Sequence, residues 1–330
     1  MLTAVTGASG HVGINLTMAL IARGRQVRVL SHTSNLGLEG LPVEYCRGDV
    51  GDIDTLLAAF SGVRVVYHLA AHISLSMNDW PRCAQVNIEG TRNVIEACRR
   101  SGVQRLVHFS TIHALRSEPL DTPVDESRPY VSSPDAPPYD RSKAAGEKLV
   151  RCAVDEGLDA VIINPTGVIG PFDFRPSHFG QALILIATGK MPVLIDGGFD
   201  WVDARDIAEC AIKAEETAAA GSRYLLSGHW LSMRDIAIIT AGIMGNRVPS
   251  LVCPMALARA CAPIITAASG LTGTRPIFTG VSLDALVSNR DISHQKATSE
   301  LGYAPRPVSE TLNDTIQWFK DNGYIKSKRP

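Results

Sequence analysis

The sequence predicts an α/β protein with a doubly wound parallel sheet and a smaller, mostly helical C-terminal lobe. Two observations predict this fold. Apolar, β-rich runs alternate with helical segments through the first 165 residues, and a glycine-rich turn follows the first run. Strands buried on both faces read as continuous apolar runs, and repeated strand–helix–strand units imply parallel strands with helices on both sides.

The predicted elements of this half follow one another in a regular order. Apolar runs indicate the strands, and glycine, a common helix stop, ends each helical segment. The strands are predicted at 2–6, 26–31, 43–46, 63–70, 105–110 and 159–164, and the helices at 11–24, 52–62, 83–102 and 142–157.

After residue 165 the alternation breaks. A helix and a short strand are predicted within 175–198, then a long helix at 203–221 and a strand at 223–228, and the last hundred residues are mostly helical. We therefore expect a dinucleotide-binding domain at 1–165, with 200–228 returning to it. The substrate-binding lobe is expected to comprise 166–199 and 229–330.

Composition excludes several classes of protein. A 45% hydrophobic content, 20% charged content and a net charge of −1 fit a globular enzyme and argue against nucleic-acid binding. Seven scattered cysteines, never spaced Cys-x-x-Cys, favour free thiols in a reducing compartment over disulfides or a metal site. With a strand predicted from Leu2, there is no room for a signal peptide, so a cytoplasmic location is expected.

One long apolar stretch, 251–271, could suggest a membrane span. Pro254, Arg259 and Pro263 interrupt it. We expect a buried or substrate-facing helix there and no membrane span.

The stretch AVTGASGHVG places three glycines between the first strand and the first helix. Gly7 allows a tight turn, Gly10 lets the backbone approach a pyrophosphate, and Gly13 lets the helix pack close to the sheet. The helix N-terminus adds unpaired N–H groups and a partial positive charge. At this strand–helix junction the pattern predicts a Rossmann-type dinucleotide site, which would also include His11 and Val12.

The choice of dinucleotide depends on the end of the second strand. An acidic residue there binds the ribose hydroxyls of NAD, whereas a basic one accommodates the 2′-phosphate of NADP. The chain has Ser31, His32 and Thr33 at this point. NADP(H) is therefore favoured over NAD(H). Asp49 and Val50, after the third strand, are candidates to meet the adenine, although Asp49 reads equally well as a turn or helix-cap carboxylate.

Tyr139 and Lys143 are the candidate catalytic pair. They are four residues apart at the start of a predicted helix and so share one face. We expect the ammonium, together with the charged ring of a bound nicotinamide, to lower the pKa of the phenol, which would make it a general acid near neutral pH. The strand end FSTIHA (109–114) offers a hydroxyl to hold a substrate carbonyl. A second Tyr-x-x-x-Lys, Tyr324 to Lys328, lacks this context and serves as an internal negative control.

These motifs together resemble the extended short-chain dehydrogenase/reductase family over nearly the whole chain. The matching stretches are TGASGHVG, HLAA (68–71), NIEGTRN (87–93), FST (109–111), YDRSK (139–143), NPTGVIGP (164–171) and WVDARDIAE (201–209). Within the family, the chain is most similar to dihydroflavonol and cinnamoyl-CoA reductases, their bacterial relatives, and hopanoid-associated sugar epimerase-like proteins.

The resemblance implies a Rossmann fold, a nicotinamide cofactor and a Ser/Thr–Tyr–Lys triad. Tyr139 would be the acid–base, Lys143 would bind the nicotinamide ribose, and Thr111, or less favourably Ser110, would orient the carbonyl. Trp201, Asp203 and Asp206 read as structural. Residues implied in holding the cofactor are Leu69, Ala70 and Ala71 by backbone contact, Asn87 from behind, and Asn164, Pro165, Gly167 and Val168 along the nicotinamide.

Two departures from the family narrow the activity. Sugar dehydratases follow the catalytic Thr with Asp-Glu, but this chain has Ile112-His113, which argues against dehydration. Plant flavonoid reductases place an Asn where this chain has Arg116, which argues against flavonoid specificity. The candidates for the substrate pocket are His72, Ile73, His113, Arg116, Phe172, Arg175 and His178.

The leading hypothesis is a carbonyl reductase or alcohol dehydrogenase acting on a small molecule. The alternative is a nucleotide-sugar epimerase with tightly held NAD, for which Arg175 and Arg290 are the only candidates to bind a diphosphate. A non-catalytic redox sensor is a third class, but such proteins usually lose the tyrosine or lysine. Family members are often homodimers through a bundle that includes the helix at 142–154.

Overall fold

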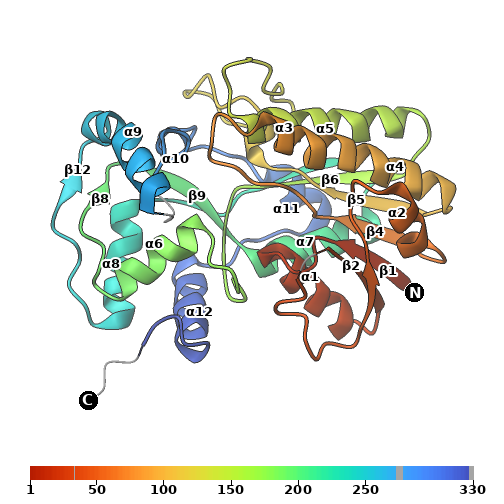
Figure 1. The fold of residues 1–330 in the computed structure, drawn as a ribbon, viewed down its shortest axis with the longest axis horizontal. Helices are drawn as coiled ribbons and strands as arrows, with labels where there is room; N and C mark the ends of the chain where they lie inside the picture. Colours follow the sequence, from red (N-terminus) through yellow and green to blue (C-terminus); the bar gives the residue numbers. More distant parts are fainter. Residues whose placement is uncertain (33, 273–277, 327–330) are drawn as a thin grey trace.

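The computed structural model describes residues 1–32, 34–272 and 278–326. Its centre is a seven-stranded parallel sheet in the order β10-β6-β5-β4-β1-β2-β3, so the predicted parallel sheet is confirmed (Figure 1). The strand order reverses between β1 and β4, as in doubly wound nucleotide-binding folds. The strands are β1 (Leu2–Thr6), β2 (Gln26–Ser31), β3 (Val43–Arg47), β4 (Val65–His68), β5 (Arg105–Phe109), β6 (Ala160–Pro165) and β10 (Arg223–Leu226).

Helices cover both faces of this sheet. In Figure 1, α2, α4 and α5 lie above it, and α1 and α7 lie below. Each layer buries its own apolar core: Leu16 and Leu20 of α1 pack below, and Phe60 of α2 and Val94 of α4 pack above. The bounds are α1 (His11–Ala22), α2 (Ile53–Phe60), α4 (Gly90–Arg100), α5 (Pro138–Asp155) and α7 (Ala204–Thr217).

The helix predicted over 83–102 is confirmed in its extent, but it is not α-helical throughout. A short helix, α3 (Trp80–Cys83), is followed by a π-helical turn, η1 (Ala84–Glu89), before α4 begins. The turn lies against α5 at Gly146, where a Cβ atom would come within 2.5 Å of the Asn87 carbonyl oxygen. Glycine therefore permits this close approach, which brings Asn87 next to the start of α5.

The second lobe contains a small sheet that the sequence analysis did not predict. Its strands are β7 (Gly167–Ile169), β9 (Gly198–Asp203) and β11 (His229–Ser232), in the order β11-β9-β7. Trp201, Ile236 and Phe319 belong to the core that this sheet forms with helices. The helices of this core are α6 (His178–Ala187), α8 (Met233–Met244) and α12 (Val308–Asp321).

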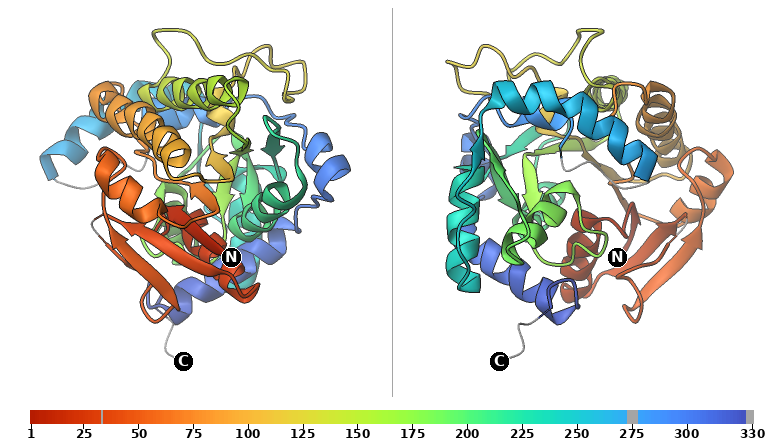
Figure 2. Two further views of the ribbon diagram at one scale, coloured as in Figure 1. Left: turned by 90° about the vertical axis from the view of Figure 1, so that its right-hand side faces the viewer. Right: turned by 60° about the vertical axis from the view of Figure 1, so that its left-hand side comes forward.

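The remaining elements lie around this core. The predicted short strand after α6 is β8, which pairs with β12. Figures 1 and 2 show α9 and α10 at one edge of the second lobe. Across the described ranges, no helix has the length and apolarity required to cross a membrane. The bounds are η2 (Ile112–Ala114), β8 (Leu194–Ile195), β12 (Val252–Cys253), α9 (Met255–Thr272), α10 (Gly280–Ala285) and α11 (Gln295–Leu301).

Candidate active site

A cleft of about 2170 Å³ opens at the carboxyl ends of the central strands. Its lining begins at Gly7 after β1, includes Leu69 after β4 and Ser110 after β5, and ends against α9 and α10. Doubly wound sheets bind their ligands at this edge, where the strand order reverses. The cleft is therefore the candidate active site.

The glycine loop needs its glycines for steric reasons. Gly7 has φ +72°, and a Cβ atom there would lie 2.6 Å from the Ala70 nitrogen. A Cβ atom on Gly13 would lie 2.2 Å from the Gly7 carbonyl oxygen. Gly10 closes the turn by donating its N–H to the Gly7 oxygen at 3.0 Å. The loop and the start of α1 can thus pack this tightly only because Gly7 and Gly13 lack side chains.

The N-terminus of α1 suits an anion. Its first turn carries no acidic residue, and His11, Val12 and Gly13 line the cleft. The first N–H groups of a helix have no partner within the helix and attract negative charge. The loop and helix therefore fit the pyrophosphate of a dinucleotide.

His11 ties this helix to the second lobe. Its Nε2 atom lies 3.0 Å from the Gly170 oxygen and 3.1 Å from the Pro171 oxygen. Asn15 donates to the same Pro171 oxygen at 3.2 Å. These contacts fix the segment after β7 beside the glycine loop.

At the far end of the cleft, His32 and Asp49 form a pair. His32 Nε2 and Asp49 Oδ2 are 2.9 Å apart, and both residues line the cleft together with Val50. Ser31 lies outside the lining, and its hydroxyl donates to Asn35. Thr33 falls outside the described residues. Because β3 lies beside β2, the Asp49 carboxylate, which follows β3 in the sequence, reaches the end of β2.

Tyr139, Thr111 and Lys143 meet on the wall of the cleft. Tyr139 stands in the first turn of α5, and its side chain is hydrogen-bonded to that of Thr111, which directly follows the strand end at Ser110. Lys143 is 4% exposed, and its Nζ donates to the Phe109 oxygen at 2.6 Å. Tyr324 is elsewhere: its hydroxyl donates to the Phe174 oxygen at 2.7 Å, and Lys328 lies outside the described residues.

The protein's own groups do not acidify the Tyr139 phenol, so the expected lowering of its pKa would depend on the charged nicotinamide ring. Burial raises the pKa of Tyr139 well above its usual range, the Asp140 carboxylate raises it further, and the Thr111 hydrogen bond lowers it by less. The pKa of Lys143 is itself lowered to about 8 by burial. The protein therefore holds Tyr139 protonated, as a proton donor must be.

Glu147 extends the row of Tyr139 and Lys143 by one more helical turn. It is fully buried, with Oε1 2.7 Å from Arg223 Nε. Tyr130 donates to Oε1 at 3.0 Å, and Asn164 donates to Oε2 at 2.8 Å. The spacing of four residues was visible in the sequence, but Arg223 comes from β10 and could not be inferred from spacing.

Two buried histidines lie near Lys143 and stay uncharged. Burial, with a smaller contribution from the Lys143 charge, lowers the pKa of His68 to about 3 and that of His108 well below its usual range. His68 Nδ1 lies 2.8 Å from the Thr6 hydroxyl. Because neither imidazole is protonated, neither adds a charge beside the lysine.

Asn87 supports the segment after β4 from behind, as the resemblance implies. Its Oδ1 accepts from His72 N at 2.8 Å, and its Nδ2 donates to the His72 oxygen at 2.9 Å and to Ser142 Oγ at 2.9 Å. Asn87 lies outside the cleft lining, whereas Leu69, Ala70 and Ala71 belong to it. The Asn87 side chain thus joins the segment at His72 to Ser142 of α5.

Asn164 also acts behind the cleft. Its side chain is fully buried outside the lining and donates to the Thr111 oxygen at 3.0 Å as well as to Glu147. Its side chain therefore positions Thr111 and Glu147, and the placing of the 164–168 segment along a nicotinamide stays a prediction. Pro165, Gly167 and Val168 line the cleft, as does Ser110.

The rest of the cleft is lined by the second lobe together with the segments that follow β4 and β5. Of the predicted substrate residues, all but Phe172 line it: His72, Ile73, His113, Arg116, Arg175 and His178. Phe172 has φ +70° and packs against Trp318, with ring centroids 6.0 Å apart, so its place in the pocket is wrong. His113 stacks on Phe199 at 5.5 Å. Sequence analysis missed the apolar wall of Leu115, Leu120, Val124, Met191, Leu194, Phe199, Phe278, Leu286 and Ile292.

Trp201, Asp203 and Asp206 have the structural roles expected for them. Trp201 is 7% exposed and packs against Phe179. Asp203 caps α7 by accepting from Arg205 N, and Asp206 accepts from Arg306 N at 2.9 Å.

The fold and the cleft define a Rossmann-type nicotinamide-dependent enzyme. The chain belongs to the NAD dependent epimerase/dehydratase family, whose model matches residues 3–226. The membership of the extended short-chain dehydrogenase/reductase family that the sequence indicated is therefore confirmed. NAD-dependent oxidoreductase and epimerase chemistry both fit a member of this family.

Three similar proteins illustrate the match. Sterol demethylase protein B of Methylococcus capsulatus is 33% identical over 98% of this chain and 100% of its own length. A 4-hydroxy-2-methyl-3-oxo-4-farnesyl-3,4-dihydroquinoline-1-oxide ketoreductase of Stigmatella aurantiaca is 29% identical over 96% of both chains. The crystal structure of gox2253 has a TM-score of 0.85 and 32% identity, covering 98% of this chain and 99% of that one.

Proposed function

We propose that this protein is an NAD(P)-dependent carbonyl reductase or alcohol dehydrogenase whose substrate is a bulky apolar ketone or the matching alcohol. The observation that carries the proposal is the grouping of Tyr139, Thr111 and Lys143 on the wall of one cleft with the glycine loop. The bound nicotinamide would supply or accept the hydride.

The cofactor would lie along the lining already described. The glycine loop and the N-terminus of α1 would hold the pyrophosphate, and His32 and Asp49 would contact the adenosine end. Lys143 would bind the nicotinamide ribose. Leu69 to Ala71 and Pro165 to Val168 would line the path by backbone and apolar contact.

Tyr139 would transfer the proton at the substrate oxygen. Because burial keeps the phenol protonated, it can donate to the oxygen of a carbonyl as that oxygen gains charge. The Thr111 hydroxyl, hydrogen-bonded to the Tyr139 side chain, would orient the same oxygen. Asn164 and Glu147 would position this pair by holding the Thr111 carbonyl and the neighbouring lysine charge.

An apolar substrate is supported by the second lobe. Its side of the cleft is lined mainly by aliphatic and aromatic residues, among them Phe199, Phe278 and Leu286. Two relatives carry names that refer to a sterol and to a farnesylated quinoline. Since apolar pockets bind apolar ligands by removing both surfaces from water, we propose a polycyclic or isoprenoid-bearing ketone.

Epimerase activity is the second candidate, because the matching family includes epimerases. It would need cations to hold a nucleotide diphosphate. Arg175 lines the cleft, whereas Arg290 stacks on Trp230 at 4.4 Å. Arg259, which also lines the cleft, is paired with Asp284 at 2.6 Å. Among the described residues, Arg116 and Arg175 are thus the arginines of the cleft that have no ion pair, ring contact or side-chain hydrogen bond, and they would have to hold the diphosphate.

We propose NADP(H) as the preferred cofactor. Support comes from His32, which lies at the end of β2 and can donate to a 2′-phosphate. Asp49 beside it is the feature that would favour NAD(H) instead, because its carboxylate would repel a phosphate. Competition between NADPH and NADH, followed by their fluorescence on binding, distinguishes the two.

The experiment that tests the function is a turnover screen. Purified protein is given NADPH or NADH with sterol-type and isoprenoid ketones, simple aldehydes and nucleotide sugars, and the oxidised cofactor and product are measured. Stoichiometric release of oxidised cofactor with an apolar ketone supports the reductase. Conversion of a nucleotide sugar without net cofactor oxidation supports the epimerase, and binding of neither cofactor contradicts both.

Three further expectations belong to the same proposal. We propose that 1–165 with 200–228 forms the cofactor domain and that the remaining residues form the substrate lobe, supported by the position of β10 beside β6. A homodimer through a four-helix bundle that includes α5 is proposed from the family resemblance, with sedimentation as its test. A cytoplasmic location is proposed because all seven cysteines are free thiols.

A further inference from the structure

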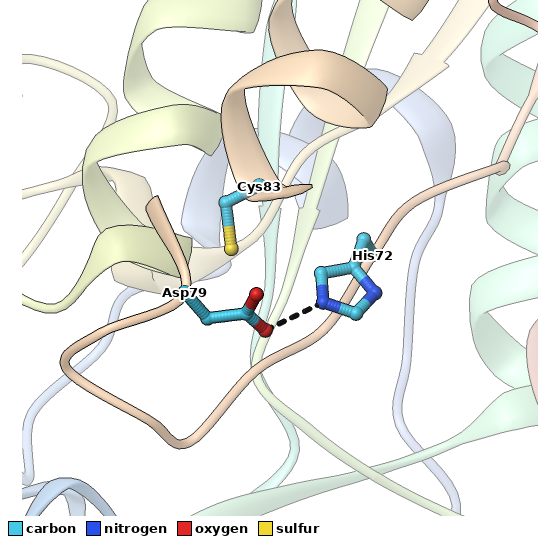
Figure 3. Close-up of side chains that lie close together, drawn as sticks. All are labelled: His72, Asp79 and Cys83. Atoms are coloured by element: carbon cyan, nitrogen blue, oxygen red, sulfur yellow. Dashed lines mark hydrogen bonds and ion pairs between the residues drawn. The ribbon is translucent and has the colours of Figure 1, made fainter. Parts of the chain in front are cut away.

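Three metal-binding residue types meet beside the candidate active site (Figure 3). His72 follows β4, Asp79 precedes α3, and Cys83 ends α3. One ligand atom from each lies within 4.8 Å of the others, and His72 Nε2 is 2.7 Å from Asp79 Oδ2. The spacing of seven and four residues matches no known zinc motif, which is why the sequence indicated no metal.

The cluster is closed on one side and open on the other. Cys83 is fully buried, while the side chains of His72 and Asp79 are 34% and 32% exposed. His72 also lines the cleft. An ion held by the three would therefore have protein behind it and an open position toward the cleft.

Each of the three residues has its own supporting hydrogen bond. Asn87 fixes the backbone of His72 on both sides. The Asp79 carboxylate is bonded to the Ser74 hydroxyl, and the Cys83 thiol to the Ser142 hydroxyl. Metal sites are typically built in this way, with outer groups that orient the ligands.

The nearest cation does not occupy the cluster. The Arg82 guanidinium donates to Gln85 Oε1 at 3.0 Å. A carboxylate and a thiol that can become a thiolate thus face one imidazole, and this set of oxygen, sulfur and nitrogen donors is the one that Zn²⁺ prefers.

We propose that His72, Asp79 and Cys83 form a binding site for a zinc-class divalent cation, with three protein ligands and one position open to the cleft. Small side-chain rotations would widen the His72–Asp79 contact to the ligand spacing of a tetrahedral ion. The ion would fix the segment from 72 to 79, of which residues 72–78 line the cleft, and so alter access to Tyr139.

The test uses chelator-treated full-length protein, with Zn²⁺ and Co²⁺ as probes. We expect one Zn²⁺ per chain at micromolar affinity by calorimetry, a rise in melting temperature with Zn²⁺, and a thiolate-to-cobalt charge-transfer band with Co²⁺. Asp79→Asn and Cys83→Ser should each weaken binding by at least about 100-fold. The control is Cys152→Ser, which removes an exposed thiol of α5 that is not part of the cluster; it should bind Zn²⁺ as the parent does.

Either of two results overturns the site. One is a parent protein that binds no Zn²⁺ at micromolar concentration. The other is a cobalt band or a melting shift that persists in Asp79→Asn. Because Asp79 is partly exposed and Asn has nearly its shape, that variant is expected to fold, so the test stands even if Cys83→Ser does not.

Discussion

Replacing Arg223 with Met tests the buried support of the candidate site. The change leaves the Glu147 carboxylate fully buried, with only neutral donors, Tyr130 and Asn164, and the Lys143 ammonium one turn away. Removing one partner of a buried ion pair strands the other charge, and this costs about 3–5 kcal/mol. We therefore expect the free energy of unfolding to fall by about 3–5 kcal/mol.

The assay is urea unfolding followed by far-UV circular dichroism, with a double-mutant cycle. Glu147→Leu together with Arg223→Met should cost less than Arg223→Met alone, since no buried carboxylate then remains. A loss below about 1 kcal/mol in the single variant, the level of an exposed pair, would refute the reasoning. The reasoning would also be refuted if adding Glu147→Leu to Arg223→Met lowered stability by as much as Glu147→Leu lowers that of the parent. The two effects would then be additive, and the two side chains would not be coupled.

Four other variants test separate parts of the structure. Gly13→Ala should lower the free energy of unfolding by about 1–3 kcal/mol and weaken NADPH binding, because its Cβ would lie 2.2 Å from the Gly7 oxygen. Gly242→Ala, whose Cβ would meet nothing within 4 Å, should raise the free energy of unfolding by about 0.5–1 kcal/mol. Both are measured by urea unfolding. The pKa of Lys143 is lowered to about 8 from 10.5, so the unfolded chain binds this proton more tightly and stability should rise from about pH 8 to 10.5, a rise that Lys143→Met should lose. His32→Asp should shift the ratio of NADPH to NADH affinity toward NADH, and an unchanged ratio would contradict the role of His32.

The sequence predicted the parallel sheet well because its strands are long, apolar and separated by helices. It missed the small sheet of the second lobe because β7 is three residues long and separated from β6 by Thr166 alone. The helix through Ala84–Glu89 was predicted, but its π-helical hydrogen bonding was not, since its apolar spacing differs little from that of an α-helix. These elements depend on tertiary packing, which local patterns do not encode.

For the site, the predictable part was the part encoded by local spacing. Tyr139 and Lys143 share a helix face, and Gly7 to Gly13 form one turn. The contact of Glu147 with Arg223 depends on β10 lying beside β6, and the meeting of His32 with Asp49 depends on β2 lying beside β3. The pKa of Tyr139 depends on burial, which no spacing reveals.

The most direct test of the central claim is the turnover of Tyr139→Phe relative to the parent enzyme, with the ketone that the screen identifies. If the Tyr139 hydroxyl donates the proton, turnover should fall by about 100-fold or more while NADPH affinity stays nearly the same. Tyr324→Phe, which removes a phenolic hydroxyl bonded to Phe174 instead, should leave turnover unchanged. Equal turnover of Tyr139→Phe and the parent would contradict the account.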